Sequence, residues 1–418
     1  MLRKNNKFTL LSLGLLSTIA MTVQADPIAK QHIIVAPQCL IKNLSTHYNT
    51  LSSTTSLALI ETNHVGIDAL IEAKNIRTTT PCGGFMDVTD AWNEYHPTNF
   101  STLDRATSFL HNYATPNPKL HHLTKPEYTI RYQDQVNQLL TQIFTPQNIW
   151  ADLTQFSDTH STQFPDRYAN SSTGVKAATW LKEKVEAMAK DHNRSDITVY
   201  TVATGTQYKQ PSVVVKIGDS NEPGIVIGGH MDTLSSSWEL KPGADDDGSG
   251  SMTVMEVART LIASGMHFKK PIYIIWYSAE ELGLIGSGYV VKDFKKKNIP
   301  VDAVLQLDMT GYANNNDPTI WLITDNVNND LTAYLETLVK TYVKQPVGRT
   351  QCGYDCSDHA SWNQAGFAAS FPFEAQFGKD DPYIHTSRDT MDILSLSHMA
   401  DFAKLGVAFA VELAEPLV

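Results

Sequence analysis

The chain has 418 residues, of which 42% are hydrophobic, and a formal net charge of −11. Its length exceeds that of one typical domain and predicts about two. An acidic surface does not attract nucleic acid or anionic lipid, so we expect no nucleic-acid partner and no electrostatic binding to a membrane.

Residues 1–25 are predicted to be an export signal peptide. Three basic residues precede an apolar run from 8 to 23, and a small-residue cleavage site ends at Ala25. Removing this segment takes away three cations and no anions, which changes the formal net charge from −11 to −14. The run is too short and too rich in Ser and Thr for a stable membrane span, and no later segment approaches about 20 consecutive apolar residues. We therefore predict an exported protein without a membrane span, either secreted or periplasmic.

The next segment, residues 26–115, is predicted to be a small α+β N-terminal module. It offers strand candidates at 33–41 and 56–60 and a short helix candidate near 67–73. Residues 116–130 then form a predicted linker, because their prolines block both helix and ladder formation.

The remaining residues, 131–418, alternate between helix candidates and nearly continuous apolar strands. This pattern predicts an α/β domain with a mostly parallel central sheet flanked by helices. The strand candidates are 212–216, 224–227, 271–277, 301–307, 319–323 and 368–373. The helix candidates are 174–190, 248–264, 286–296, 330–343 and 397–413.

The four cysteines form an even set in a predicted exported chain, which favours disulfides over free thiols. Three pairings are possible. We favour Cys39 with Cys82 and Cys352 with Cys356, because each pair then lies inside one predicted domain. A Cys-x3-Cys zinc site is the alternative for the second pair, but no other Cys or His pair stands nearby at structural-zinc spacing.

A histidine and an aspartate follow the strand candidate 224–227. In the run Gly-Gly-His230-Met-Asp232, the strand period of two places both side chains on one side of the chain, just beyond a strand end. A metal-bound imidazole usually needs a hydrogen-bond acceptor on its other nitrogen, which Asp232 would provide for His230. Taken alone, this spacing more commonly means a hydrogen-bonded pair that caps a strand.

Three consecutive acids, Asp245, Asp246 and Asp247, precede an amphipathic helix candidate. Helix capping and the favourable interaction with the helix dipole account for one or two of them. Three acids in a row repel one another, and a cation between them relieves the repulsion. One carboxylate can also bridge two ions through its two oxygens.

Two adjacent acids, Glu280 and Glu281, follow the buried strand candidate 271–277. Ionised side chains near apolar surroundings are costly without a partner, which disfavours a simple solvent-exposed turn. Adjacent carboxylates can divide the work at a metal centre, because one can coordinate the metal while the other accepts a proton from water.

Asp308 follows a further strand candidate, and His385 lies in a polar loop. Each alone would more often be structural, but successive strand ends here deliver His or acidic residues where open α/β sheets bind ligands. Asp246, Glu281 and Asp308 with one shared hydroxide carry four negative charges, which balance two divalent ions. Mixed His and carboxylate ligands suit zinc, and cobalt or manganese can occupy the same set.

With these residues in place, the chain resembles the secreted bacterial leucyl aminopeptidases, which are co-catalytic dizinc metalloaminopeptidases of the zinc exopeptidase clan with an α/β fold. The resemblance covers the chain from about residue 145 to the C-terminus. It rests on the motifs Gly229-His-Met-Asp232, Pro242-Gly-Ala-Asp-Asp-Asp-Gly248, Ser278-Ala-Glu-Glu-Leu-Gly283, Gln306-Leu-Asp-Met309, Cys352-Gly-Tyr-Asp-Cys-Ser-Asp-His-Ala-Ser-Trp362 and Ile384-His-Thr386.

The resemblance implies two Zn²⁺ ions per chain. One zinc ion would be held by His230 and Asp308, the other by Glu281 and His385, and Asp246 would bridge them. The peptide bond between Asp246 and Asp247 is expected to be cis, which is rare where no proline is involved.

The resemblance also implies which residues carry out the reaction. Glu280 would act as general base and then as general acid, and Asp232 would orient His230. Tyr354 would donate a hydrogen bond to the developing oxyanion, and the Cys352–Cys356 disulfide would staple the loop that presents it.

The implied reaction is hydrolysis of the N-terminal residue from peptides with a free N-terminus. We also expect the enzyme to be a monomer. Positions that match the side-chain pocket of the family are mostly apolar, which implies a preference for Leu and other large apolar residues. These positions are Met309, Cys352, Tyr354, Cys356, Phe371, Phe373, Phe377 and Ile384.

Residues 26–115 lie outside the resemblance. We predict that they form an inhibitory propeptide, because a small Cys-paired module is joined here to an exported protease by an exposed linker. Cleavage in the linker would then raise the activity.

Three alternative functions have to be weighed. Other exopeptidases of the clan often insert a lid domain before the last histidine, for which the 77 residues from Asp308 to His385 leave no room. Glutaminyl cyclases share the fold with one zinc ion, whereas the charge count indicates two. A non-catalytic binding protein on this scaffold would have lost a ligand or the base, and all of them are present.

Overall fold

The computed structural model describes most of the chain after residue 30. The described residues are 31–42, 44, 48–74, 83–97, 101–114, 128–157, 164–235 and 240–417. All of them belong to one compact unit. The predicted signal peptide at 1–25 and most of the predicted linker at 116–130 lie outside these residues. Cys82 also lies outside them, so its pairing with Cys39 stays a prediction.

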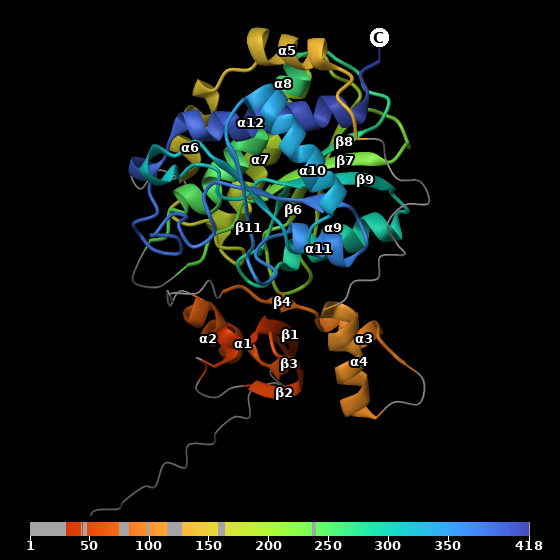
Figure 1. The fold of residues 1–418 in the computed structure, drawn as a ribbon, viewed down its shortest axis with the longest axis vertical. Helices are drawn as coiled ribbons and strands as arrows, with labels where there is room; N and C mark the ends of the chain where they lie inside the picture. Colours follow the sequence, from red (N-terminus) through yellow and green to blue (C-terminus); the bar gives the residue numbers. More distant parts are fainter. Residues whose placement is uncertain are drawn as a thin grey trace, which may run out of the picture. The chain divides into compact units, whose positions relative to one another are not determined.

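A six-stranded sheet forms the centre of the C-terminal part of the chain (Figure 1). In spatial order its strands are β12 (Ala369–Ser370), β9 (Val301–Gln306), β7 (Gly224–His230), β8 (Ile272–Tyr277), β6 (Ser212–Ile217) and β5 (Ile197–Val202). The pairs from β12 to β8 are parallel, whereas β8–β6 and β6–β5 are antiparallel. The predicted α/β fold with a mostly parallel central sheet is therefore confirmed.

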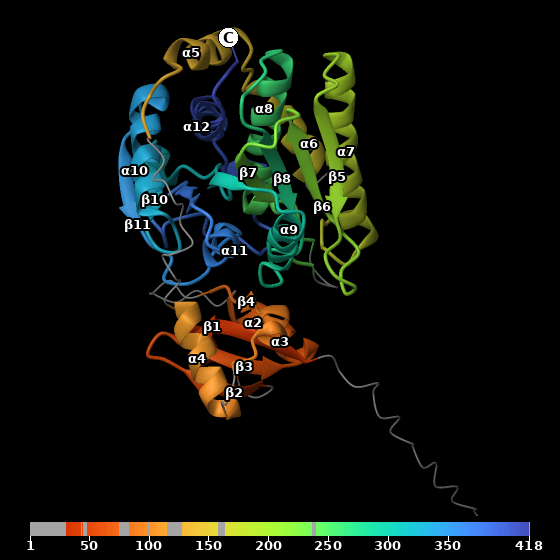
Figure 2. The ribbon, with the colours of Figure 1, turned by 90° about the vertical axis from the view of Figure 1, so that its right-hand side faces the viewer.

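Helices cover both faces of this sheet (Figure 2). The helices on one face are α5 (Gln133–Gln142), α6 (Gln147–Ser157), α7 (Ser172–Asp191), α8 (Gly250–Ala263) and α12 (Leu396–Ala414), and those on the other are α9 (Ile285–Lys296) and α11 (His359–Gln364). Successive strand residues point to opposite faces, so Ile225 and Ile274 join the larger core cluster while Val226 and Ile275 join the smaller one. Among the helices of the described residues, none is both long and apolar enough to cross a membrane.

Three short strands form a separate sheet in the order β11 (Val347–Thr350), β10 (Ile320–Ile323) and β13 (Pro372–Phe373). The single strand predicted at 368–373 is wrong, because β12 joins the central sheet whereas β13 joins the smaller one. Pro372 accounts for the break, since proline lacks the amide hydrogen that a continuous ladder needs. The helix predicted at 330–343 is likewise divided into α10 (Asn329–Leu338) and a π-helical turn (Val339–Val343).

The described residues up to Ala114 form an α+β module, as predicted. Its antiparallel sheet has the order β2 (Tyr48–Ser53), β3 (Leu57–Thr62), β1 (His32–Pro37) and β4 (Met86–Asp87). The described helices of this region are α1 (Gln38–Ile41), α2 (His64–Lys74), α3 (Thr89–Glu94) and α4 (Thr102–Ala114). The strand predicted at 33–41 ends at Pro37 and gives way to α1, while β2, β4, α3 and α4 are additions to the predicted elements.

The central sheet brings distant acidic and histidine residues to one edge. Strands β7, β8 and β9 run parallel, so their carboxyl ends lie side by side. His230 ends β7, Glu280 and Glu281 follow β8 closely, and Asp308 follows β9. This edge is where open α/β sheets bind their ligands.

Gly286 in α9 has no room for a side chain. A methyl group there would lie 1.9 Å from the backbone oxygen of Ser278, just before the two glutamates. We expect Gly286→Ala to lower the free energy of unfolding by about 1–3 kcal/mol, measured by urea denaturation. Gly288→Ala in the same helix is the control, because its methyl group would have nothing within 4 Å and should stabilise the helix by up to about 1 kcal/mol. Equal stability of the two variants would contradict this packing.

Candidate metal centre and substrate pocket

The five predicted metal ligands converge at the carboxyl edge of the central sheet. The Nε2 atom of His230 lies 3.0 Å from Oδ1 of Asp246 and 3.6 Å from Oδ1 of Asp308. The Nε2 atom of His385 lies 3.0 Å from Oδ2 of Asp246 and 3.1 Å from Oε2 of Glu281. The two oxygens of Asp246 therefore face two different groups of potential ligands.

Asp247 is a further candidate ligand, but its oxygens are engaged elsewhere. Potential ligand atoms lie within 4.8 Å of one another in two groups, His230 with Asp247 and Asp308, and Asp246 with Glu281 and His385. The carboxylate of Asp247 accepts the backbone amides of His230 (3.0 Å), Gly250 (2.8 Å) and Met309 (3.1 Å). These bonds use both of its oxygens, so Asp247 fixes the backbone of neighbouring segments. The peptide bond that joins it to Asp246 is cis, as predicted.

Asp232 holds the turn that carries the two glutamates. Its Oδ1 accepts the amide of Glu280 at 3.0 Å, and its Oδ2 accepts the amide of Glu281 at 3.3 Å. On the other side, the backbone oxygen of Asp232 lies 3.2 Å from Nδ1 of His230, while the carboxylate lies 3.6 Å from the same nitrogen. Asp232 thus contacts His230, as expected, and also positions the acids after β8.

Glu280 and Glu281 differ in their access to solvent. The side chain of Glu281 is 2% exposed and lies beside His385, whereas that of Glu280 is 11% exposed. The Oε2 atom of Glu280 lies 4.0 Å from Nε2 of His230. Glu280 is therefore the acid of the pair that lies at the accessible rim of the centre.

Burial and the crowding of acids determine the protonation of the centre. Burial lowers the pKa of His230, but Asp308 and Glu280 outweigh this effect and raise the pKa well above its usual value. Burial raises the pKa of Asp246, but hydrogen bonds from the two histidines outweigh it and hold the pKa well below its usual value. For Asp308, burial dominates and raises the pKa. Its buried Oδ1 accepts no hydrogen bond from the described residues, and such an oxygen suits a cation.

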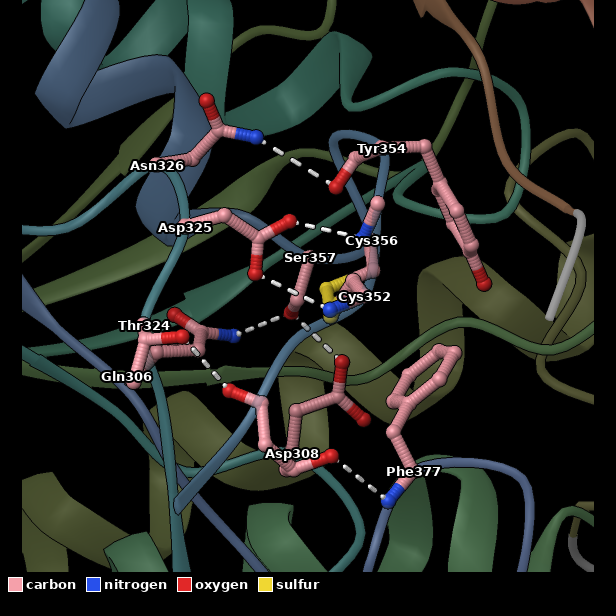
Figure 3. The surroundings of a disulfide bond; sticks show 12 residues. Gln306, Asp308, Thr324, Asp325, Asn326, Cys352, Tyr354, Cys356, Ser357 and Phe377 are labelled. Carbon is pink, nitrogen blue, oxygen red and sulfur yellow. Dashed lines mark hydrogen bonds between the residues drawn. A yellow bond between two sulfur atoms is a disulfide. The ribbon is translucent and has the colours of Figure 1, made fainter.

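The predicted disulfide between Cys352 and Cys356 is present, with an S–S distance of 1.96 Å (Figure 3). Asp325 anchors the loop that the disulfide closes. Its carboxylate accepts the amide of Cys352 at 2.9 Å and the amide of Gly353 at 2.7 Å. The loop is therefore held both by a covalent bond and by a carboxylate from another segment.

Residues of this loop contact both the centre and the neighbouring aromatic residues. Tyr354 lies beside Phe377, with the ring centroids 5.9 Å apart (Figure 3). Ser357 donates a hydrogen bond of 2.5 Å to Oδ2 of Asp308. The loop thus links a predicted oxyanion donor to a predicted metal ligand.

The predicted pocket residues pack together in one apolar cluster. Its buried members include Met309, Cys352, Phe371 and Phe373, and Tyr354, Cys356, Phe377 and Ile384 are half-buried at its edge. The structure adds Ile323, which ends β10, and Val327, which follows it. Both were missed because an apolar residue at the end of a short strand, or in the loop after it, does not reveal which core it joins.

Comparison with known proteins agrees with this geometry. The model of peptidase family M28 matches residues 212–410. Leucine aminopeptidase 1 of Penicillium rubens is 34% identical over 344 residues, which cover 79% of this chain and 83% of the relative. Leucine aminopeptidase 1 of Metarhizium robertsii is 38% identical over 292 residues, which cover 67% of this chain and 72% of the relative.

Two solved structures resemble nearly the whole chain. The LapA aminopeptidase of Legionella pneumophila is 41% identical with a TM-score of 0.82, and the match covers 93% of this chain and 100% of LapA. LapB of the same organism is 38% identical with a TM-score of 0.79, and the match covers 92% of this chain and 100% of LapB. Both matches cover a larger share of this chain than residues 131–418 make up, so the likeness extends into the N-terminal module.

More distant structures share the fold alone. They include BSAP, a zinc aminopeptidase of Bacillus subtilis, at 15% identity with a TM-score of 0.53, and glutaminyl cyclase of Porphyromonas gingivalis, at 16% with a TM-score of 0.52. Because two different activities occur at this distance, only the nearer relatives identify the function. On their evidence the chain belongs to peptidase family M28 and is a zinc-dependent aminopeptidase of the leucine aminopeptidase type.

Proposed function

We propose that this aminopeptidase uses two zinc ions to remove Leu and other large apolar residues from the N-terminus of peptides. The observation that carries the proposal is the position of Asp246, whose two oxygens each lie 3.0 Å from a different histidine nitrogen. Each histidine also lies beside a further acid, Asp308 or Glu281. Such an arrangement suits two neighbouring ions that share one carboxylate.

The chemistry of the donor set supports zinc at both positions. Histidine nitrogens and carboxylate oxygens are common zinc ligands. His230, Asp246 and Asp308 would hold one ion, and Asp246, Glu281 and His385 would hold the other. The buried oxygen of Asp308 that accepts no hydrogen bond would then gain a partner.

The proposed reaction assigns a proton transfer to Glu280 and a hydrogen bond to Tyr354. When bound, the ions supply Lewis-acid activation of water and of the scissile carbonyl. Glu280 accepts the proton of the attacking water and then delivers it to the leaving amine. Tyr354 donates a hydrogen bond to the oxyanion that develops on the substrate. Burial, Asp380 and Glu280 raise the pKa of Tyr354, so its phenol stays protonated and remains a donor.

The apolar cluster supports the proposed side-chain preference. Met309 belongs to it and directly follows Asp308, so the cluster begins at the centre. Burying a Leu or Phe side chain there would contribute about 1.5–3 kcal/mol to binding, whereas a charged side chain would lose its hydration without a partner.

Replacing Glu280 by Gln removes the proposed base while preserving its shape. We expect Glu280→Gln to lower kcat for Leu-p-nitroanilide by about 10²–10⁴-fold with unchanged zinc content, measured by steady-state kinetics and elemental analysis. Chelation of the parent enzyme should abolish the activity, and added zinc should restore it.

Glu336→Gln is the matched control, because Glu336 pairs with Lys340 on the surface of the protein. This variant should keep full activity. Undiminished activity of Glu280→Gln would refute the assigned base. Hydrolysis of the Lys or Asp anilide as fast as the Leu anilide would refute the proposed preference.

Without bound cations, the acids buried near the centre resist ionisation. Burial raises the pKa of Asp245 to about 8 and that of Asp358 to about 7. Because these pKa values exceed those of the unfolded chain, the acids favour the folded state while they are protonated. This stabilisation is fully present below the pKa of an unfolded aspartate, about 4, and is lost progressively as the pH rises from there to about 7 to 8.

We therefore expect the metal-free protein to have a lower thermal midpoint at about pH 8.5 than at about pH 6, measured by calorimetry. Zinc should raise the midpoint, and more so at the higher pH, because ligand binding to the folded state stabilises it. Calcium is the control ion, since it prefers six to eight oxygen ligands and should shift the midpoint far less. A midpoint that zinc leaves unchanged at both pH values would contradict the proposed centre.

We also propose that the protein is exported, with residues 1–25 as its signal peptide. The Cys352–Cys356 disulfide supports this proposal, because structural disulfides persist mainly in oxidising compartments. Identification of Asp26 or a nearby residue as the N-terminus of the mature protein tests it.

A role for the N-terminal module follows from its contacts with the loop of Tyr354. The hydroxyl of Tyr113 donates a hydrogen bond to the carboxylate of Asp355. Gly84 packs so closely on Tyr354 that a methyl group at Gly84 would lie 2.5 Å from the tyrosine ring. The module therefore contacts the residue that is proposed to stabilise the oxyanion.

A second set of contacts reaches the turn after the two glutamates. The amide of Asp87 donates a hydrogen bond of 3.1 Å to the backbone oxygen of Gly283. Phe85 lies against the same glycine, where a methyl group would be 2.8 Å from its ring. These contacts support the proposal that the module restrains the enzyme until the chain is cleaved in the segment between 115 and 126.

Tyr113→Phe tests this restraint by removing one hydroxyl. Burial raises the pKa of Asp355 to about 6, so the acid is mostly ionised at neutral pH, and losing its hydrogen bond costs about 1.5–3 kcal/mol. We expect the uncleaved variant to be about tenfold more active than the uncleaved parent. Tyr95→Phe is the control, because its hydroxyl bonds to Ser108 inside the module. The inhibitory role is wrong if cleavage of the parent leaves its activity unchanged.

A further inference from the structure

The turn from Pro242 to Asp246 carries the carboxylate on which both proposed zinc ions depend. It precedes α8 and contains the first two acids of the run. Two buried side chains, the basic Arg167 and the acidic Asp389, bind its backbone. Neither belongs to the proposed ligands, the base or the pocket.

Arg167 binds the carbonyl side of the turn. It lies between α6 and α7, and its side chain is fully buried. The guanidinium donates to the backbone oxygens of Pro242 (2.6 Å) and Gly243 (2.8 Å) and also to that of Met231 (2.8 Å). Met231 stands between His230 and Asp232, so one side chain ties the segment of the first histidine to the turn.

Arg167 also supplies positive charge inside the protein. Burial lowers its pKa to about 10, while Asp389 and the other nearby acids oppose this shift, so the guanidinium remains charged at neutral pH. Its planar group with five donors suits several carbonyls at once, which a lysine ammonium cannot match.

Asp389 binds the amide side of the same turn. Its Oδ1 accepts the amide of Asp245 at 2.7 Å, and its Oδ2 accepts the amide of Asp246 at 3.1 Å. Its backbone oxygen accepts the amide of Ala244 at 3.3 Å. Asp389 lies in the same loop as His385, so this loop delivers one proposed ligand and anchors the backbone of another.

We propose that Arg167 and Asp389 are positioning residues for Asp246 and thereby set the affinity for both zinc ions. This inference rests on the proposed dizinc centre. The Arg167 guanidinium fixes the carbonyls of the turn and the Asp389 carboxyl group fixes its amides, so a backbone rotation that displaced Asp246 would break one set of bonds. Such support of a ligand from outside the coordination sphere typically changes metal affinity by about 10–100-fold.

Two conservative variants remove this support. In Asp389→Asn one acceptor oxygen is replaced by an NH₂ group, which would face a backbone amide that is itself a donor. Arg167→Lys keeps the charge but loses the planar fork that reaches three carbonyls.

Two matched controls carry the same exchanges away from the turn. Arg194 is also buried and donates to the backbone oxygens of Leu261 and Ile262, both at 3.2 Å, while pairing with Asp196. Arg194→Lys therefore imposes a comparable loss on the core. Asp392→Asn is the same Asp-to-Asn substitution at an exposed position, three residues after Asp389.

Zinc affinity of the metal-free full-length chain, measured by competition with a chromophoric chelator, decides the proposal. We expect Asp389→Asn and Arg167→Lys to bind zinc about 10–100-fold more weakly than the parent. The two control variants should stay within about twofold of the parent, even where Arg194→Lys lowers the thermal midpoint. Circular dichroism establishes that each variant is folded, and the nearly isosteric Asp389→Asn decides alone if Arg167→Lys is not.

The positioning role is overturned if both turn variants bind zinc as tightly as the parent and lose only thermal stability, as expected for Arg194→Lys from its loss of buried hydrogen bonds. If the parent binds two zinc ions and both turn variants keep the parental affinity, the proposed function stands and only this inference is refuted. A parent that binds fewer than two zinc ions refutes the dizinc centre and the inference with it.

Discussion

The structure buries seven acidic side chains around one edge of its central sheet. The acids concerned are Asp232, Asp245, Asp246, Asp247, Glu281, Asp308 and Asp389. A buried carboxylate is tolerated only when hydrogen bonds or opposite charges replace its lost hydration. Backbone amides and the buried guanidinium of Arg167 supply part of this compensation, and zinc ions would supply the rest. The same acids that demand cations therefore also organise the backbone around them.

Acids outside the proposed ligand set connect the segments that carry the ligands. Asp232, two residues after His230, holds the amides of the two glutamates. Asp247, next to Asp246, holds the amides of His230 and Met309. Asp389, four residues after His385, holds the amides before and at Asp246. Three of the five ligand segments thus fix the backbone of another, so the histidines and acids are held near their places by the fold itself. Preorganisation of this kind lowers the cost of assembling a metal site.

Much of this arrangement could be predicted from the sequence, because it follows from local patterns. A histidine or an acid directly after an apolar strand is visible in the chain, and parallel strands must bring such residues to one edge, as they do for His230 and Asp308. The smaller sheet was not predictable in the same way, since the division at Pro372 and the inclusion of Ile323 in the apolar cluster depend on tertiary pairing. Nor does the sequence reveal that Asp389 accepts amides from residues 144 and 143 positions away.

The loop closed by Cys352 and Cys356 contacts the apolar cluster, the proposed metal centre and the N-terminal module. Tyr354 packs on Phe377 of the cluster, Ser357 binds Asp308, and Asp355 receives the hydrogen bond from Tyr113. In the described part of the chain, the module contacts this loop and the turn at Gly283, whereas Asp246 is held from behind by Arg167 and Asp389. The proposed restraint by the module would therefore act on Tyr354 and on the glutamate turn, which includes the proposed ligand Glu281, and not on the backbone contacts that hold Asp246. Release of the module would then change the rate of the reaction without altering the contacts of Asp246.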